Sequence, residues 1–263
     1  MKRIDLKISI LLAFVCFIGG FFVVPYQLDS LQETKPEQYE LLVRSMPIPL
    51  SVLSVISALQ IMIISFVLAY IGIKLARKTG FKLNLLDALF KKEKVTIDSK
   101  SVIKALIFGG ITAFVITASD RFYFQNKIGL LGEMEQNFSL IGLLAGVFYG
   151  GVFEEIMLRL LVMSLFVWLM LKLFRQTVQS LPSFYYWVAI IIASLLFAAG
   201  HLPATKLLSG ELTNILILRC FLLNGIGGIF FGYLYWKKGL EYAIFAHMFT
   251  HIAMQIVFIP LFY

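Results

Sequence analysis

The sequence predicts an all-α fold, a polytopic bundle of seven or eight transmembrane helices. The 263 residues are 60% hydrophobic and only 14% charged, with a mean hydropathy of +0.88, whereas soluble domains carry about 25% charged residues. Several apolar runs also reach the roughly 20 residues that a helix needs to cross a bilayer. We therefore expect one integral membrane domain over residues 1–263, not a soluble domain with a single anchor.

Seven apolar runs are candidate spans, at 8–26, 48–73, 102–118, 139–171, 184–203, 212–236 and 239–261. The fourth is long, and Gly150-Gly151 within it could divide it into a short segment and a full span, which would make eight. The first run lacks a small-x-small cleavage site, so we interpret it as a retained span. Gly228 and Gly232 are four residues apart in the sixth run, which favours close packing against another helix.

Basic residues alternate between the loops. Segment 74–104 holds nine Lys and Arg against three acidic residues, while loops 27–47 and 119–138 are slightly acidic. Cytoplasmic loops are enriched in Lys and Arg, so the N-terminus is expected in the cytoplasm and the C-terminus outside. The expected location is the plasma membrane of a prokaryote, and the net charge of +8 does not indicate nucleic-acid binding.

Segment 74–104 is predicted to lie at the membrane surface as an amphipathic element. Its apolar residues recur at helical spacing between lysines: Phe81, Leu85, Leu86, Leu89 and Phe90.

The stretch FEEIMLR, residues 153–159, places three charged side chains inside an apolar span. Each costs at least ~2.5–3.5 kcal/mol at mid-bilayer, so each needs a partner. Glu155 and Arg159 are four residues apart with the acid first, which predicts an ion pair along one helix face. Glu154 is rotated by about 100° from Glu155 and needs a partner from another helix.

The three histidines of the chain, His201, His247 and His251, all lie in the last three spans. His247 and His251 are four residues apart and share one face of the last helix. Ionisable groups inside a membrane are functional candidates, although each histidine alone could simply bond a neighbouring carbonyl. Arg219 is a further charge in this region, which could reach the membrane surface or pair with a carboxylate near the site.

The two cysteines, Cys16 and Cys220, lie in apolar runs. They offer neither a disulfide framework nor a thiolate metal site.

Three short motifs occur in order on the last spans. EEIMLR fits the pattern EExxxR, FAAGH (Phe197 to His201) fits FxxxH, and HMFTH fits HxxxN except at its last position. In this order they resemble the CPBP family of intramembrane proteases, which comprises CAAX prenyl proteases type II and the Abi, or bacteriocin-processing, proteins. The resemblance covers about residues 139–255 as a catalytic core, while residues 8–118 are expected only to supply further spans. The patterns HExxH, GxGD and GxSG of other membrane proteases are absent from the sequence.

The resemblance implies an endopeptidase that cleaves a membrane-associated or lipidated, CAAX-like peptide. It implies that Glu154 and His201 activate a water molecule, and that His247 and His251 stabilise the oxyanion. Glu155, Arg159 and Phe197 are expected to support them. No cofactor is expected in this mechanism. As an alternative, Glu154, His201, His247 and His251 form a set of ligands suited to Zn²⁺.

Two other function classes remain open. A non-catalytic membrane binding or immunity protein could keep the same fold. A transporter is less favoured, because the charges cluster in one C-terminal site and no paired broken helices are visible. The expected partners are the lipid bilayer and a peptide substrate, with no nucleic acid, whereas substrate identity and oligomeric state stay open.

The depths of the site residues disagree when they are counted along ideal helices. Glu154 and His201 each lie roughly 24–27 Å from the polar ends of their spans, but His247 lies only roughly 13 Å from Lys238. We expect the three side chains to meet only if helices tilt, a segment re-enters the membrane, or a polar cavity lowers one end.

Overall fold

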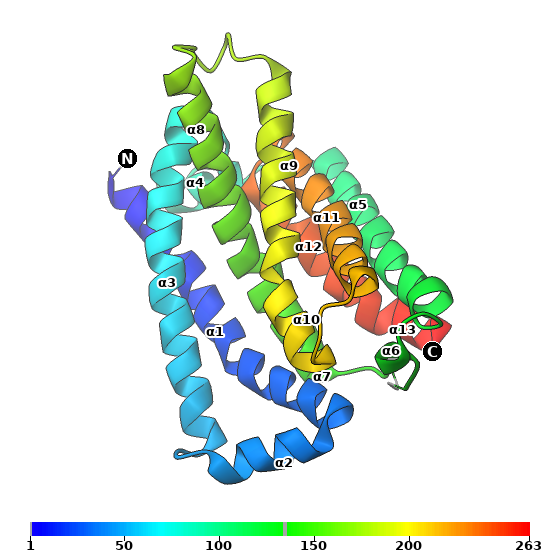
Figure 1. Cartoon of the computed structure of the whole chain (residues 1–263). Helices are drawn as coiled ribbons and strands as arrows, with labels where there is room; N and C mark the ends of the chain where they lie inside the picture. The colour runs from blue at the N-terminus through cyan, green and yellow to red at the C-terminus, as the bar shows by residue number, and fades with distance from the viewer. Residues whose placement is uncertain (1, 134–135) are drawn as a thin grey trace.

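A computed structural model describes residues 2–133 and 136–263, and these are mainly helical, with no strand among them (Figure 1). The elements are α1 (Lys2–Thr34), α2 (Pro36–Ser45), α3 (Leu50–Thr79), α4 (Asn84–Lys91), α5 (Ser99–Ser119), η1 (Asp120–Phe124), α6 (Gly129–Glu133), α7 (Leu140–Leu144), η2 (Ala145–Glu154), η3 (Ile156–Met163), α8 (Ser164–Leu173), α9 (Ser183–Gly200), α10 (Leu202–Ser209), α11 (Asn214–Lys237), α12 (Leu240–Ala253), η4 (Met254–Phe258) and α13 (Ile259–Phe262), where η marks a π-helical segment.

In the part of the chain that the structure describes, seven helices are long and apolar enough to cross a membrane. They are Arg3–Thr34, Leu50–Thr79, Ser99–Phe124, Leu140–Leu173, Ser183–Ser209, Asn214–Lys237 and Leu240–Phe262. The all-α, multi-pass membrane fold is thus confirmed.

The fourth span runs without a break from α7 through η2 and η3 into α8. The expected division at Gly150-Gly151 does not occur, so the eight-span version is wrong. A break in hydrocarbon would leave backbone groups without partners, whereas π-helical turns keep the helix continuous. Both glycines serve close packing on α12 instead. A Cβ on Gly150 would lie 2.7 Å from His251, and one on Gly151 would lie 2.5 Å from Met248.

The N-terminal hairpin of α1 and α3 packs directly on the fourth span. A Cβ added at Gly19 would lie 2.7 Å from the backbone of Tyr149, and one at Gly72 would lie 2.8 Å from Leu160. Gly20 meets Ala58 in the same way between α1 and α3. The first two spans therefore support the helix that carries Glu154.

Helices α9 and α11 lie side by side, with small residues between them. Gly228 faces Ser194, and Gly232 faces Ile190, so closely that a Cβ on either glycine would come within 3.0 Å of its neighbour. This confirms the close packing expected from the spacing of Gly228 and Gly232.

Helix α4 lies in the segment that joins the end of the second span, α3, to the start of the third span, α5. Its apolar face packs on the core through Leu86 and Phe90, while Leu89 is 54% exposed. This agrees with an amphipathic surface helix. Phe81 departs from the expectation, because it is buried against Tyr186 and Tyr235; the chain turns inward at Gly80, which has a φ of +76°.

The site residues lie at different distances from their helix ends because one hairpin, α8–α9, projects further than the others. Figure 1 shows α8 and α9 extending beyond the other helices at their end of the bundle. Glu154 lies roughly 28 Å from Leu173 at the end of α8, while His247 lies only roughly 10 Å from the start of α12. Because the α8–α9 hairpin projects, the side chains meet although their distances from the helix ends differ.

Candidate active site

Three helices bring Glu154, His201 and His247 together. Glu154 ends η2, His201 directly follows α9, and His247 lies in the middle of α12. The Nε2 atom of His201 lies 3.8 Å from Oε1 of Glu154, and the Nε2 atom of His247 lies 3.8 Å from Oε2 of the same carboxylate. The side chain of His201 is 36% exposed, and that of Glu154 is 14% exposed, so the site is accessible from the His201 side.

The second ring nitrogen of each histidine is held by an acceptor. Nδ1 of His201 lies 2.9 Å from the carbonyl oxygen of Phe197, and Nδ1 of His247 lies 2.9 Å from Oε1 of Glu155. An acceptor at Nδ1 places the proton of a neutral imidazole there and leaves a lone pair on Nε2. Both lone pairs thus face Glu154 at a separation longer than a direct hydrogen bond. A water molecule or a substrate group at the carboxylate can bond to these atoms.

Glu155 connects Arg159 to His247. Its Oε1 atom lies 3.3 Å from Nη1 of Arg159, and both side chains are fully buried. Arg159 also donates from Nη2 to the carbonyl oxygen of Gly228 at 3.1 Å. The expected pairing of Glu155 with Arg159 is present, and it extends by one further bond to the catalytic candidate His247.

Phe197 and Phe231 enclose this charged pair. The guanidinium carbon of Arg159 lies 5.2 Å from the ring centroid of Phe197 and 5.5 Å from that of Phe231, within cation–π range. Phe197 also meets His201 edge to face with centroids 4.8 Å apart, and Phe231 stacks on His247 at 4.6 Å. The two rings therefore fix the planes of both histidines.

His251 lies one turn after His247 and stacks on it, with ring centroids 5.2 Å apart. Its ring occupies a notch formed by Gly146 and Gly150, where an added Cβ would come within 2.7 Å of the ring nitrogens. Its Nε2 atom is buried without a hydrogen-bond partner. No ion pair links it to a carboxylate of the described chain, unlike the other two histidines.

The proposed zinc ligands do not form a ready metal site. Among residues 2–133 and 136–263, no three His, Cys, Asp or Glu side chains are grouped so as to hold a metal ion. The Nδ1 partners of His201 and His247 resemble those that orient metal-binding histidines, but His251 is not joined to Glu154.

The remaining candidates lie away from this site. Arg219 forms an ion pair with Asp120 at the end of α5, so its carboxylate partner is not one of the site. Cys16 and Cys220 are buried free thiols, and the Cys220 thiol donates to the carbonyl oxygen of Ala198.

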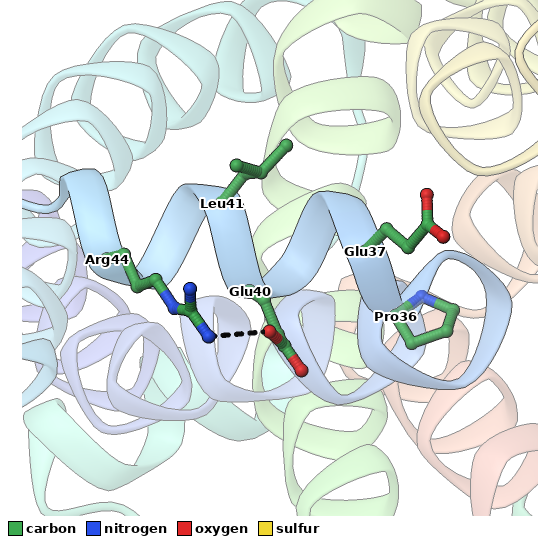
Figure 2. A pocket seen from close by; sticks show the side chains of 5 residues that line it. All are labelled: Pro36, Glu37, Glu40, Leu41 and Arg44. Carbon is green, nitrogen blue, oxygen red and sulfur yellow. Dashed lines mark hydrogen bonds and ion pairs between the residues drawn. The ribbon is translucent and has the colours of Figure 1, made fainter.

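Two surface hollows also lie elsewhere. One of them, about 340 Å³, is lined by residues at α2 where Arg44 pairs with Glu40, as Figure 2 shows. The other is lined by residues of α1, of α2 and of the segment that joins α2 to α3. Neither contains a residue of the Glu154 site.

Three features of the site were missed in the sequence, one of them the ring of Phe231, which stacks on His247. The bond between Glu155 and His247 joins residues 92 positions apart, and the Gly228 carbonyl is a backbone group that carries no residue-type signal. The three-motif order predicted which side chains matter, but no local pattern indicated these contacts.

The fold and these polar side chains define a helical membrane protein with a Glu–His site. Residues 136–253 match the family model described as type II CAAX prenyl endopeptidase Rce1-like. This match supports the CPBP, or CAAX protease, family, which the three motifs predicted. The Rce1-like family implies a membrane protease of the CAAX type. Neither a curated protein nor a solved structure gives a significant match to the chain.

Proposed function

We propose that this protein is a glutamate-type intramembrane endopeptidase, which hydrolyses a peptide bond with water activated by Glu154 and His201. The observation that carries the proposal is the position of the Glu154 carboxylate, 3.8 Å from Nε2 of both His201 and His247. A carboxylate in such low-dielectric surroundings is suited to general-base catalysis near neutral pH.

In the first step, a water molecule binds between Glu154 and His201. His201 accepts a hydrogen bond from it through Nε2, because Nδ1 already bonds the Phe197 carbonyl. Glu154 takes the proton as the water oxygen attacks the carbonyl carbon of the scissile peptide bond. This forms a tetrahedral intermediate that carries a negative oxygen.

His247 and His251 lie on the side of α12 where they can stabilise that oxyanion. His247 needs a proton on Nε2 for this contact, and Glu155 Oε1, at 2.9 Å from Nδ1, fixes the orientation of its ring. The buried Nε2 of His251 is free of other partners and serves as the second donor. Glu154 then returns its proton to the leaving amine as the C–N bond breaks.

The substrate class we propose is a membrane-associated or lipidated, CAAX-like peptide, because the site lies among spanning helices. We also propose that the protein resides in the plasma membrane of a prokaryote. Its basic loops support a cytoplasmic N-terminus.

A peptide-cleavage assay tests this proposal. Purified protein is given a library of membrane-inserted and lipidated peptides, with and without a chelator, next to Glu154→Gln. We expect cleavage that resists the chelator and falls by ~10²–10⁴-fold in Glu154→Gln, with unchanged thermal unfolding of that variant.

Other outcomes decide between the alternatives. Loss of activity with the chelator, together with stoichiometric zinc in the parent, would replace the water mechanism by a zinc protease. A parent that binds peptides without cutting any would indicate the non-catalytic binding or immunity protein.

A further inference from the structure

The segment between α3 and α5 combines basic and apolar side chains on an exposed surface. Lys82, Lys91, Lys92 and Lys94 are exposed, and three apolar side chains among them are exposed as well: Leu89 at 54%, Val95 at 43% and Ile97 at 58%. Because it connects the ends of two spanning helices, this segment lies at the edge of the bilayer. We call residues 82–97 the basic segment.

The basic segment is tied to the start of α12, the helix that carries His247 and His251. Three hydrogen bonds join the basic segment, or Asp98 directly after it, to the first three residues of α12. They are Leu240 N to Lys82 O at 3.1 Å, Leu86 N to Glu241 Oε1 at 3.0 Å, and Asp98 N to the Tyr242 hydroxyl at 3.0 Å.

The same segment is anchored on its other side by one arginine. Arg77, at the end of α3, donates to Asp87 in α4 and to Asp5 in α1. Lys238 lies 3.5 Å from Asp98 and adds a further link near the start of α12. The basic segment is thus held between α1 and α3 on one side and α12 on the other. A displacement of the segment would therefore also displace the start of α12.

We propose that the basic segment binds anionic lipid headgroups and thereby holds α12 in place. Lysines at a membrane surface attract anionic lipids, and apolar side chains among them insert at the boundary of the acyl chains. A soluble acidic partner would satisfy the lysines alone, but it would leave Leu89, Val95 and Ile97 exposed. A lipid surface satisfies both kinds of side chain. The proposal is independent of whether the site cleaves peptides.

The first experiment measures lipid association with the full chain in phosphatidylcholine vesicles that contain spin-labelled phosphatidylglycerol. In Lys91→Gln with Lys94→Gln, we expect the association constant for the anionic lipid, relative to phosphatidylcholine, to fall about 30-fold.

The matched control is Lys172→Gln with Arg175→Gln, which removes two exposed charges. They lie at the α8–α9 hairpin, which projects past the ends of the other helices (Figure 1) and so past the bilayer edge where the basic segment lies. It should leave lipid association near the parent value. Equal losses in both variants, or no loss in either, would overturn the proposed binding surface.

The second experiment tests the link to α12 by amide hydrogen exchange in vesicles with and without the anionic lipid. We expect the anionic lipid to slow exchange in α12 of the parent. Tyr242→Phe removes the acceptor of the Asp98 amide and should reduce that slowing while lipid association persists. If the anionic lipid leaves α12 exchange unchanged in the parent, the link is refuted, whatever the protease assay shows.

Discussion

Glu155 links the buried cation Arg159 to His247 in the site. The same carboxylate oxygen, Oε1, lies 3.3 Å from Nη1 of Arg159 and 2.9 Å from Nδ1 of His247. The side chain is fully buried. A buried carboxylate in this position stays charged only while its cation is present. Arg159 therefore supports the orientation of His247 through Glu155.

Arg159→Ala should destabilise the fold by ~3–5 kcal/mol, because it leaves the Glu155 carboxylate buried without a cation. Thermal unfolding in detergent measures this loss. The double variant Glu155→Gln with Arg159→Met removes both charges and should recover most of the stability. An Arg159→Ala protein that melts like the parent would show that the pair contributes nothing.

His251→Asn should keep its proteolytic activity. If the site works without metal, position 251 needs only a donor beside His247, and an amide supplies one. The smaller side chain also fits the notch of Gly146 and Gly150, which now holds an imidazole. Cleavage and bound metal are measured together. Loss of both zinc and activity in this variant would exclude the metal-free mechanism.

At the scale of elements, α9 and α11 depend on the absence of a side chain at Gly228. An added Cβ would lie 2.7 Å from the side chain of Ser194 and 2.9 Å from its Cα. The Gly228 carbonyl also accepts from Arg159. Separation of the two helices would therefore disturb the charged pair as well as the packing.

Gly228→Ala should destabilise the protein, and Gly225→Ala in the same helix is its matched control. Both changes gain up to ~1 kcal/mol of helix propensity. An added Cβ at Gly225 meets nothing within 4 Å, so this variant should melt at or above the parent temperature. If both variants melt alike, close packing at Gly228 is not needed.

At the scale of the molecule, seven spans place the two chain ends on opposite sides of the membrane. Figure 1 shows α1 starting near one end of the bundle and α13 finishing near the other. The loop charges further predict that the N-terminal side is cytoplasmic.

Reporter fusions at the two ends test this topology. A reporter active only in the cytoplasm should work at the N-terminus and fail at the C-terminus, and a reporter active only outside should behave in the opposite way. Two ends on the same side would contradict the seven-span arrangement, while a simple reversal would contradict only the orientation.

The sequence by itself determined the class of fold and the polar residues worth testing. Apolar runs of about 20 residues specify spanning helices, because the bilayer requires every backbone group to be bonded within its own segment. Spacing along one helix likewise predicted the pairing of Glu155 with Arg159, since residues four apart share a face. The order of the three motifs predicted the family.

Only the tertiary structure decided how these residues meet. The bond from Glu155 to His247, the notch around His251 and the pairing of Arg219 with Asp120 each join residues on different helices. Helical periodicity fixes which face a side chain takes, but it does not fix how far one helix is shifted along another. Here the α8–α9 hairpin projects beyond the other helices (Figure 1), so Glu154, His201 and His247 meet although they lie at different distances from their helix ends.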